Sequence, residues 1–241
     1  MCIDNTSPRP IEFVRQAERY YAALVAHSDT QQGLGGKLLY AGTLDAETRP
    51  LMVAANVAGA ASLAVAADTA TQKQAARDGI VDFLVTSLDE ALRILKNEVR
   101  KRATVAVCVA ASPAEIVQEM QERGVVPDFV AAGAVPLSST AERVDPLPVS
   151  HPSVRLEWQA SSAPALWMPQ LEEIAHACLP VEDAAAHRWL KLAPRYCGRT
   201  AMGLRVLRCT SPIAEEFSMR VAESILSGAI DVPVDVGTTA D

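Results

Sequence analysis

Short apolar segments alternate with helical segments along the first half of the chain, and this alternation restricts the fold more than any other feature. The apolar runs are four to nine residues long and recur roughly every 25 residues. Strands that alternate with helices in this way form a parallel sheet with right-handed crossovers. The sequence therefore predicts an α/β three-layer sandwich with a mostly parallel sheet. The strand candidates are KLLYA at 37–41, ASLAVAA at 61–67, IVDFLV at 80–85, ATVAVCVAA at 103–111 and PDFVAA at 127–132.

The rest of the chain divides around this core into further segments. We expect a helix at Pro10–His27 and a loop to residue 36 before the core at 37–132, then a Pro/Ser-rich connection at 133–164. We expect 165–241 to contain two helices and a last β–α–β unit that adds to the same sheet and completes the same domain. The expected elements there are helices at 165–178 and 181–196, a strand at 203–209, a helix at 212–227 and a strand at 230–237.

Composition excludes several classes of protein. The formal charge is −7 and the hydrophobic fraction is 49%, which argues against a general nucleic-acid binder. No apolar run reaches the roughly 18 residues of a membrane span, and the start of the sequence lacks the features of a signal peptide. The cysteines are odd in number and irregularly spaced, so we expect a cytoplasmic protein with reduced thiols. They are Cys2, Cys108, Cys178, Cys197 and Cys209.

The turn after the first strand is the expected phosphate-binding site of a Rossmann-like domain, because the following helix points its free N–H groups there. Such a turn uses glycines, but here Gly42 is followed by Asp45 and Glu47. A carboxylate at close range would oppose a phosphate by about 1 to 4 kcal/mol. The glycines at 33–36 precede the strand and lie at the wrong end of the sheet, so we interpret them as a flexible connection. The sequence predicts a Rossmann-like frame with a poor nucleotide site.

Several phrases of the sequence resemble the central region of urocanase, the urocanate hydratase of histidine breakdown. They run from about Pro10 to Gly237 in the family's order. This resemblance implies a Rossmann-like domain that holds NAD tightly in the family, where NAD acts as an electrophile toward the imidazole of the substrate. The phrases are GGKLLYAG, AANVAGAASLAV, TSLDEAL, RGVVPD, HRW at His187–Trp189 followed by LA, and SG-x-x-x-x-P-x-x-x-G near the end.

The positions that bind NAD in the family differ in this sequence. The family's glycine-rich turn corresponds to Gly42–Pro50, with Asp45 and Glu47 inside it. The acidic residue that would hold the ribose falls on Ala66, Asp68 comes two positions later, and an Asn of the family falls on Ser112. The family's leading domain, and its region after Gly237, have no counterpart in this sequence. We therefore expect these family positions not to bind NAD, and we expect Asp45 and Glu47 to be solvated turn residues.

The catalytic chemistry of the family also lacks a clear counterpart. The family's catalytic cysteine aligns with Leu207, and Cys209 lies two residues away on the same face of the expected strand. Cys209 is thus the one candidate nucleophile, although a thiol on a buried strand is usually inert.

The histidines and cysteines between positions 176 and 197 are the candidate metal ligands of the sequence. His176, Cys178, His187 and Cys197 lack the spacing of zinc ligands, so we expect no metal. We expect His187 to take part in helix packing together with Trp189.

These observations favour a non-catalytic, urocanase-like pseudoenzyme with no bound cofactor, which binds a small molecule or a protein partner. The partner would be a second copy of the chain, in a homodimer, or a urocanase-related subunit. The alternative is an NAD-dependent, urocanase-like hydratase or lyase with an altered pocket, or one completed by a second chain. A third hypothesis is a nucleotide sensor without chemistry. Bound NAD would support the second and third hypotheses, and urocanate turnover would separate those two.

Overall fold

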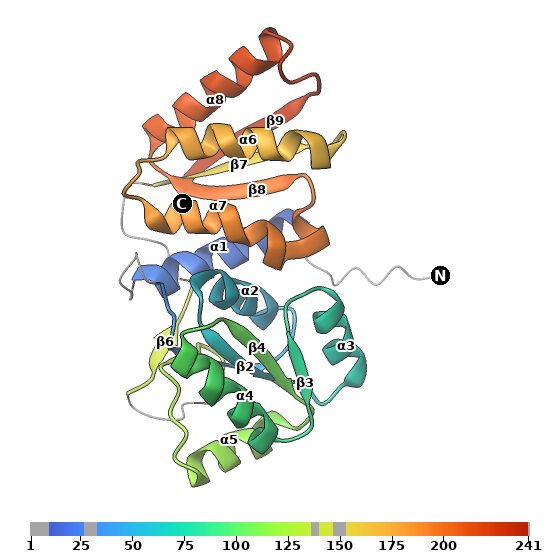
Figure 1. Cartoon of the computed structure of the whole chain (residues 1–241), viewed down its shortest axis with the longest axis vertical. Helices are drawn as coiled ribbons and strands as arrows, with labels where there is room; N and C mark the ends of the chain where they lie inside the picture. Colours follow the sequence, from blue (N-terminus) through green and yellow to red (C-terminus); the bar gives the residue numbers. More distant parts are fainter. Residues whose placement is uncertain (1–9, 27–32, 136–139, 147–152, 241) are drawn as a thin grey trace.

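The computed structural model describes residues 10–26, 33–135, 140–146 and 153–240. Figure 1 shows two halves. A parallel sheet with its helices forms the lower half, and a smaller sheet with three helices forms the upper half. Helix α1, Pro10–Ala26, crosses between the halves and contacts α2 of the lower half and β8 of the upper one. The predicted helix is confirmed over Pro10–Ala26, and its last predicted residue, His27, lies outside the described residues.

The lower half contains the six-stranded sheet, in the order β3-β4-β2-β1-β5-β6, and every pair of neighbouring strands is parallel. β2 and β4 are buried along their whole length, as expected for central strands with helices on both faces. The α/β prediction is confirmed. The strands are β1 Leu38–Thr43, β2 Ala61–Val65, β3 Phe83–Val85, β4 Val105–Val109, β5 Phe129–Ala131 and β6 Glu142–Val144.

Helices cover both faces of this sheet and make it the middle layer of three. The helices are α2 Thr48–Ala58, α3 Thr69–Arg77, α4 Leu88–Lys101 and α5 Pro113–Glu122. The apolar side chains of α4 and α5 pack on one face. Those of α2, together with α1, pack on the other. The sandwich is therefore built as its amphipathic helices and apolar strands require.

The upper half contains a second sheet, so the expectation that the last β–α–β unit adds to the first sheet is wrong. Its order is β8-β7-β9, and both outer strands run antiparallel to β7. Because β7 lies between β8 and β9, the last unit closes on β7 instead of the parallel sheet. Its elements are β7 Val154–Ala160, α6 Pro164–Cys178, α7 Ala184–Cys197, the short 3-10 helix η1 Gly198–Ala201, β8 Leu204–Cys209, α8 Ser211–Leu226 and β9 Val234–Ala240.

Two strands lie in the segment predicted as an extended Pro/Ser-rich connection, and that prediction is wrong for β6 and β7. In β7, Leu156 and Trp158 are buried, and Trp158 packs on Phe217 of α8 with ring centroids 4.7 Å apart. The alternation of apolar and polar residues at 154–160 is the period of a strand with one face toward a core.

Ion pairs attach α1 to the second sheet. Arg15 donates to both carboxylate oxygens of Glu157 on β7, at 2.6 and 2.7 Å. Arg208 on β8 donates to Glu18, which is only 2% exposed, at 3.0 and 3.2 Å. Apolar residues of α1, α2, α7 and the second sheet form one continuous cluster. The two halves therefore share a core in addition to these paired charges.

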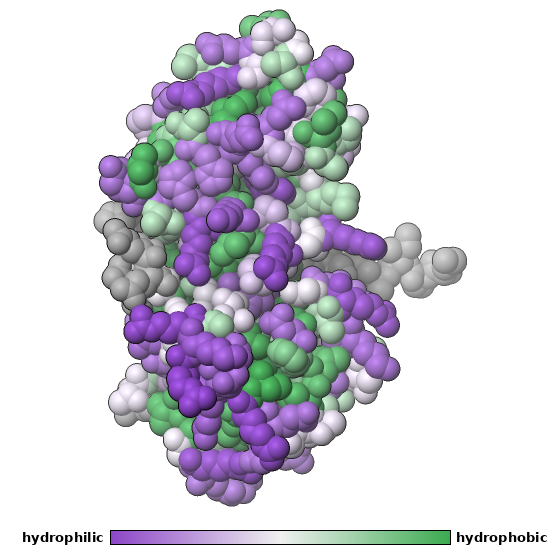
Figure 2. All heavy atoms as spheres, viewed as in Figure 1, coloured by the Kyte–Doolittle hydropathy of each residue, from purple (hydrophilic) through white to green (hydrophobic). Residues whose placement is uncertain are grey.

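The surface is mostly hydrophilic in the view of Figure 2, over the helices of both halves. A hydrophobic area is visible in the lower half, between α3 and α4, where Phe83 and Leu84 of the edge strand β3 are exposed. No helix in the part of the chain that the structure describes is both long enough and apolar enough to cross a membrane.

Candidate functional site

The carboxyl ends of β1 and β5 enclose a crevice at the point where the order of the strands reverses. β1 pairs with β2 on one side and with β5 on the other, and parallel α/β sheets bind their ligands outside such a switch point. The crevice has a volume of about 240 Å³, which is below the range of about 300 to 1,000 Å³ typical of small-molecule sites. Its lining comes from α1, the end of β1, the turn to α2, the start of α5 and the end of β5.

Gly42 shapes the floor of this crevice. β1 bulges between Tyr40 and Gly42, and Gly42 has φ +74°. A Cβ at this position would lie 3.1 Å from the Cβ of Ala134, beyond the end of β5. Glycine is thus required by the backbone conformation and by the close approach of the two strand ends.

Asp45 caps the turn that leads into α2. Its Oδ1 accepts hydrogen bonds from the backbone N–H groups of Glu47 and Thr48, both at 2.9 Å. In return, the Thr48 hydroxyl oxygen accepts the N–H of Asp45 at 2.9 Å. This reciprocal pattern is that of a capping box, with Thr in the position usually held by Glu or Gln. Asp45 and Glu47 are both exposed in this turn, as expected. Asp45 in addition accepts these hydrogen bonds, whereas the Glu47 side chain makes no such contact among the described residues.

These contacts decide how well the turn fits a dinucleotide. A pyrophosphate binds at this place through the first N–H groups of the helix, because they are free and positive. Here the carboxylate of Asp45 accepts one of them, from Thr48 at the first position of α2, and also the N–H of Glu47 in the turn just before the helix. The internal anion occupies the position that a phosphate would need, so the residues of this turn do not fit a pyrophosphate.

The end of β2 lacks a ribose-binding group as well. Ala66 is buried, and its carbonyl accepts a hydrogen bond from the amide of Gln72 at 2.5 Å. Asp68 caps α3: it accepts the N–H groups of Ala70 and Thr71 and the hydroxyl of Thr71. The hydroxyl of Thr71, followed by these two amides, lowers the pKa of Asp68. Its carboxylate therefore serves the helix and not the crevice.

Ser112 has a similar role at the start of α5. Its hydroxyl accepts the N–H of Glu115 at 3.3 Å, and Glu115 accepts the N–H of Ser112 at 3.1 Å. Both halves of a capping box are therefore present. The Ser87 hydroxyl likewise caps α4, but Glu90 accepts the N–H of Thr86 instead of Ser87.

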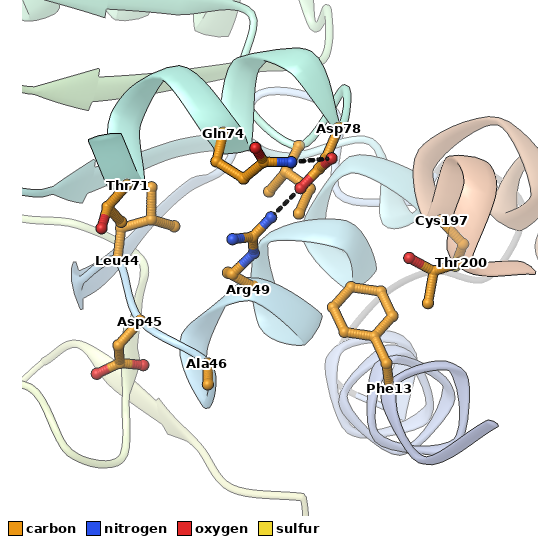
Figure 3. A pocket seen from close by; sticks show the side chains of 11 residues that line it. Phe13, Leu44, Asp45, Ala46, Arg49, Thr71, Gln74, Asp78, Cys197 and Thr200 are labelled. Carbon is orange, nitrogen blue, oxygen red and sulfur yellow. Dashed lines mark hydrogen bonds and ion pairs between the residues drawn. The ribbon is translucent and has the colours of Figure 1, made fainter. Parts of the chain in front are cut away.

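A larger cleft lies on the other side of the turn, and Figure 3 shows its side chains. Its volume is about 520 Å³. Arg49 of α2 lies at its centre and forms an ion pair with Asp78, which also accepts from the Gln74 amide at 2.8 Å. Phe13 of α1 and Thr200 of η1 form the opposite wall. Since Arg49 is paired with Asp78, its charge is already compensated within the chain.

The cysteines of the described segments are buried and disfavour ionisation. Burial, followed by the nearby charges of Asp183, Cys178 and Glu18, raises the pKa of the Cys209 thiol to about 12. Burial also raises the pKa of Cys108 to about 11 and that of Cys197 to about 12. A nucleophilic cysteine needs the opposite shift. The structure thus gives Cys209 the environment of an inert core thiol; Cys2 lies outside the described residues.

His176 and His187 join α6 to α7. Their Nδ1 atoms are 2.8 Å apart, and Nε2 of His187 lies 3.0 Å from the carbonyl oxygen of Pro180. A carbonyl can only accept, so Nε2 of His187 carries a proton, and its Nδ1 accepts from His176. Within the described segments, no three His, Cys, Asp or Glu side chains gather as a metal site would require.

Arg188 is the structural residue that sequence reasoning missed. Its Nε donates to the carbonyl of Val57, near the end of α2, at 2.7 Å. A Cβ on Gly59 would lie 2.6 Å from the Arg188 guanidinium, and one on Gly33 would lie 2.9 Å from it. The glycines that were interpreted as a flexible connection thus include one, Gly33, that makes room for a side chain from α7. The HRW phrase in the sequence marked this structural role. Both Arg188 and its neighbour Trp189 donate to backbone carbonyls of other elements, Trp189 to that of Val206 at 2.6 Å.

Comparison with known families gives a match that agrees with the parallel α/β sandwich of the lower half. Residues 21–134 match the family model described as the urocanase Rossmann-like domain. The matched segment begins within α1 and contains β1 to β5 with the helices between them. It therefore includes the crevice floor, the Asp45 turn and the ends of β2 and β4.

Proposed function

Because residues 21–134 match the urocanase Rossmann-like domain, we propose that this chain is a non-catalytic member of that family that binds a ligand other than NAD. In this proposal the domain keeps the frame of a cofactor-binding sandwich and has lost both the dinucleotide site and the hydratase chemistry. Its role is then recognition of a small ligand at the carboxyl end of the parallel sheet.

The capping of α2 by Asp45 is the observation that carries this proposal. A dinucleotide would have to displace the carboxylate from two backbone N–H groups and then bind beside its negative charge. Two unit charges about 4 Å apart repel by about 1 to 4 kcal/mol in the range from bulk water to a protein surface. A loss of this size weakens binding by roughly 5- to 1,000-fold.

Two further features support the proposal independently. The ribose position is the buried methyl of Ala66, so a hydroxyl group would find no carboxylate there. The candidate nucleophile Cys209 has a pKa of about 12 because it is buried, and only the thiolate attacks efficiently. A urocanase-like reaction would need both of these positions to be different.

The ultraviolet spectrum and native mass of the purified protein test this proposal, together with an assay of urocanate turnover. We expect the spectrum of a protein without nucleotide, the mass of the bare chain or its oligomer, and unchanged urocanate absorbance with added NAD. Co-purified NAD without turnover would instead indicate a nucleotide sensor. NAD with turnover would establish the alternative, an enzyme with an altered pocket.

A further inference from the structure

The charges and rings around the crevice suit a ligand of the opposite sign from a dinucleotide. Asp45 and Glu47 both line it, and neither lysine nor arginine is among its described lining residues. Arg143 of β6 reaches the rim, where its guanidinium donates to the carbonyl of Ala132. The carboxylates of the lining thus face the crevice without a cation between them.

Two tyrosines line the same crevice, and the partly exposed ring is that of Tyr20. Tyr20 comes from α1 and Tyr40 from β1. Burial raises the pKa of Tyr20, and the charges of Asp145, Glu47 and Asp45 raise it further. Three carboxylates from two segments, the turn at 45–47 and the residue after β6, therefore act on one tyrosine ring, which is half-buried at the edge of the crevice.

Tyr40 adds an observation that does not depend on the acidic residues. It is 1% exposed, and its hydroxyl has no hydrogen-bond partner in the described part of the chain. A buried hydroxyl left without a partner is unfavourable, because it has lost its hydrogen bonds to water. A polar group that is unsatisfied beside a crevice is the kind of group that a bound ligand can satisfy.

We propose that this crevice binds a small organic cation, such as an alkylated ammonium group, between the ring of Tyr20 and the carboxylates of Asp45 and Glu47, beside the buried hydroxyl of Tyr40. The inference rests on the proposed function, because it names a ligand class for a site that does not hold NAD. Aromatic faces attract cations through the ring quadrupole, and quaternary ammonium groups are recognised in this way. A volume of about 240 Å³ suits a head group of this size.

Choline and its uncharged isostere, 3,3-dimethyl-1-butanol, form a matched pair of probes. The two molecules share shape and hydroxyl group and differ in the charged nitrogen. We expect ligand-observed NMR titrations to show choline binding at least about tenfold more tightly, and more weakly as salt increases. Equal binding of the two probes, or no binding of choline, would overturn the inference.

Two variants locate the binding in the crevice. Glu47→Gln removes one charge from an exposed side chain and should weaken choline about threefold or more without changing the isostere. Tyr20→Leu removes one ring and should weaken choline as well. Glu223→Gln, on the exposed face of α8 in the other half, is the control for loss of charge and should change nothing. Choline binding that neither crevice variant alters would place the cation elsewhere.

NAD titrated into the same samples separates this inference from the proposed function. If NAD fails to bind and choline fails as well, the cation site is wrong and the proposed function stands. If NAD binds the unmodified protein, the proposed function fails, whatever choline does.

Discussion

The two ends of helix α2 are closed by side chains of the same protein, but in different ways. At its N-terminal end, Asp45 lies in the preceding turn and accepts hydrogen bonds from the backbone N–H groups of Glu47 and Thr48. Near its C-terminal end, Arg188 donates to the carbonyl of Val57 from a helix 131 positions further along the chain. Both charges also match the helix dipole. The N-terminal contact is local and lies where a phosphate would bind in the proposal above, whereas the C-terminal contact is long-range and joins the two halves.

This difference shows which part of a cofactor-binding frame has a structural role. The C-terminal end depends on Gly33, Gly59 and Arg188, so its geometry follows from packing between the halves. The N-terminal end depends on one turn, which can change its side chains without loss of the fold. A binding site of this kind can therefore disappear while the domain around it remains.

The largest effect should come from the C-terminal end of α2. Arg188→Ala removes a charged hydrogen bond and the side chain that fills the space beside Gly33 and Gly59. We expect the free energy of unfolding to fall by about 2 kcal/mol. Chemical denaturation measures this change, with Lys191→Ala on the exposed face of the same helix as control, expected within about 0.5 kcal/mol. Equal losses in the two variants would show that the long-range contact does not stabilise the protein.

The N-terminal end should respond less. Asp45→Ala removes the acceptor of two backbone N–H groups, and we expect a loss of about 1 kcal/mol in unfolding free energy. Asp45→Asn should retain most of the stability, because Asn caps about as well as Asp. A destabilised Asn variant would mean that charge, and not the cap, stabilises this turn.

Lower pH should reduce the stability of the region that contacts the C-terminal end of α2. His176 lies there, in contact with His187, the residue before Arg188 in α7. Burial lowers the pKa of His176 from its ordinary value of 6.5, and the charges of His187 and Lys191 lower it further, against the opposing effect of Glu172. The unfolded chain therefore takes up a proton near pH 6.5 that the folded chain does not, so stability falls as pH falls through this range. His176→Asn should flatten the dependence between pH 7.5 and 5.5. An unchanged slope in this variant would exclude His176 as its source.

Glu47 should give the smallest effect, because its exposed side chain does not cap the helix. Glu47→Ala should change the unfolding free energy by less than about 0.5 kcal/mol. Asp45→Ala and Glu47→Ala are a well-matched pair of variants, since both carboxylates lie in one turn and are exposed. A larger loss for Glu47→Ala than for Asp45→Ala would reverse the assignment of the cap.

Strands β1 to β5 of the parallel half were predictable because they lie in apolar runs and the helices between them carry clear caps, such as Ser112 with Glu115. Strand β6 was not, because Glu142 and Arg143 make up most of it. The second sheet was missed for a physical reason. Arg155 and Glu157 alternate with the apolar residues of β7 and are buried, so the strand resembled a polar connection. Burial of Glu157 depends on Arg15, 142 positions away, and no local pattern predicts such a pairing.

The candidate site was only partly predictable. The loss of glycines from the turn at 42–50 is visible in the sequence, as is Ala66 at the ribose position. The cap itself could have been inferred, since Asp45 and Thr48 have the spacing of a capping box. The crevice could not, because Tyr20 of α1 joins it only when α1 packs between the two sheets.

The most direct test of the central claim is an NAD titration, by calorimetry, of the unmodified protein and of Asp45→Gly. Glycine at a cap costs only a few tenths of a kcal/mol relative to Asp, so the variant keeps the fold. It also frees the N–H groups that Asp45 occupies. The account predicts that the variant binds NAD at least about tenfold more tightly than the unmodified protein. Equal affinities in the two proteins, whether tight or undetectable, would contradict the claim that the Asp45 carboxylate closes this site.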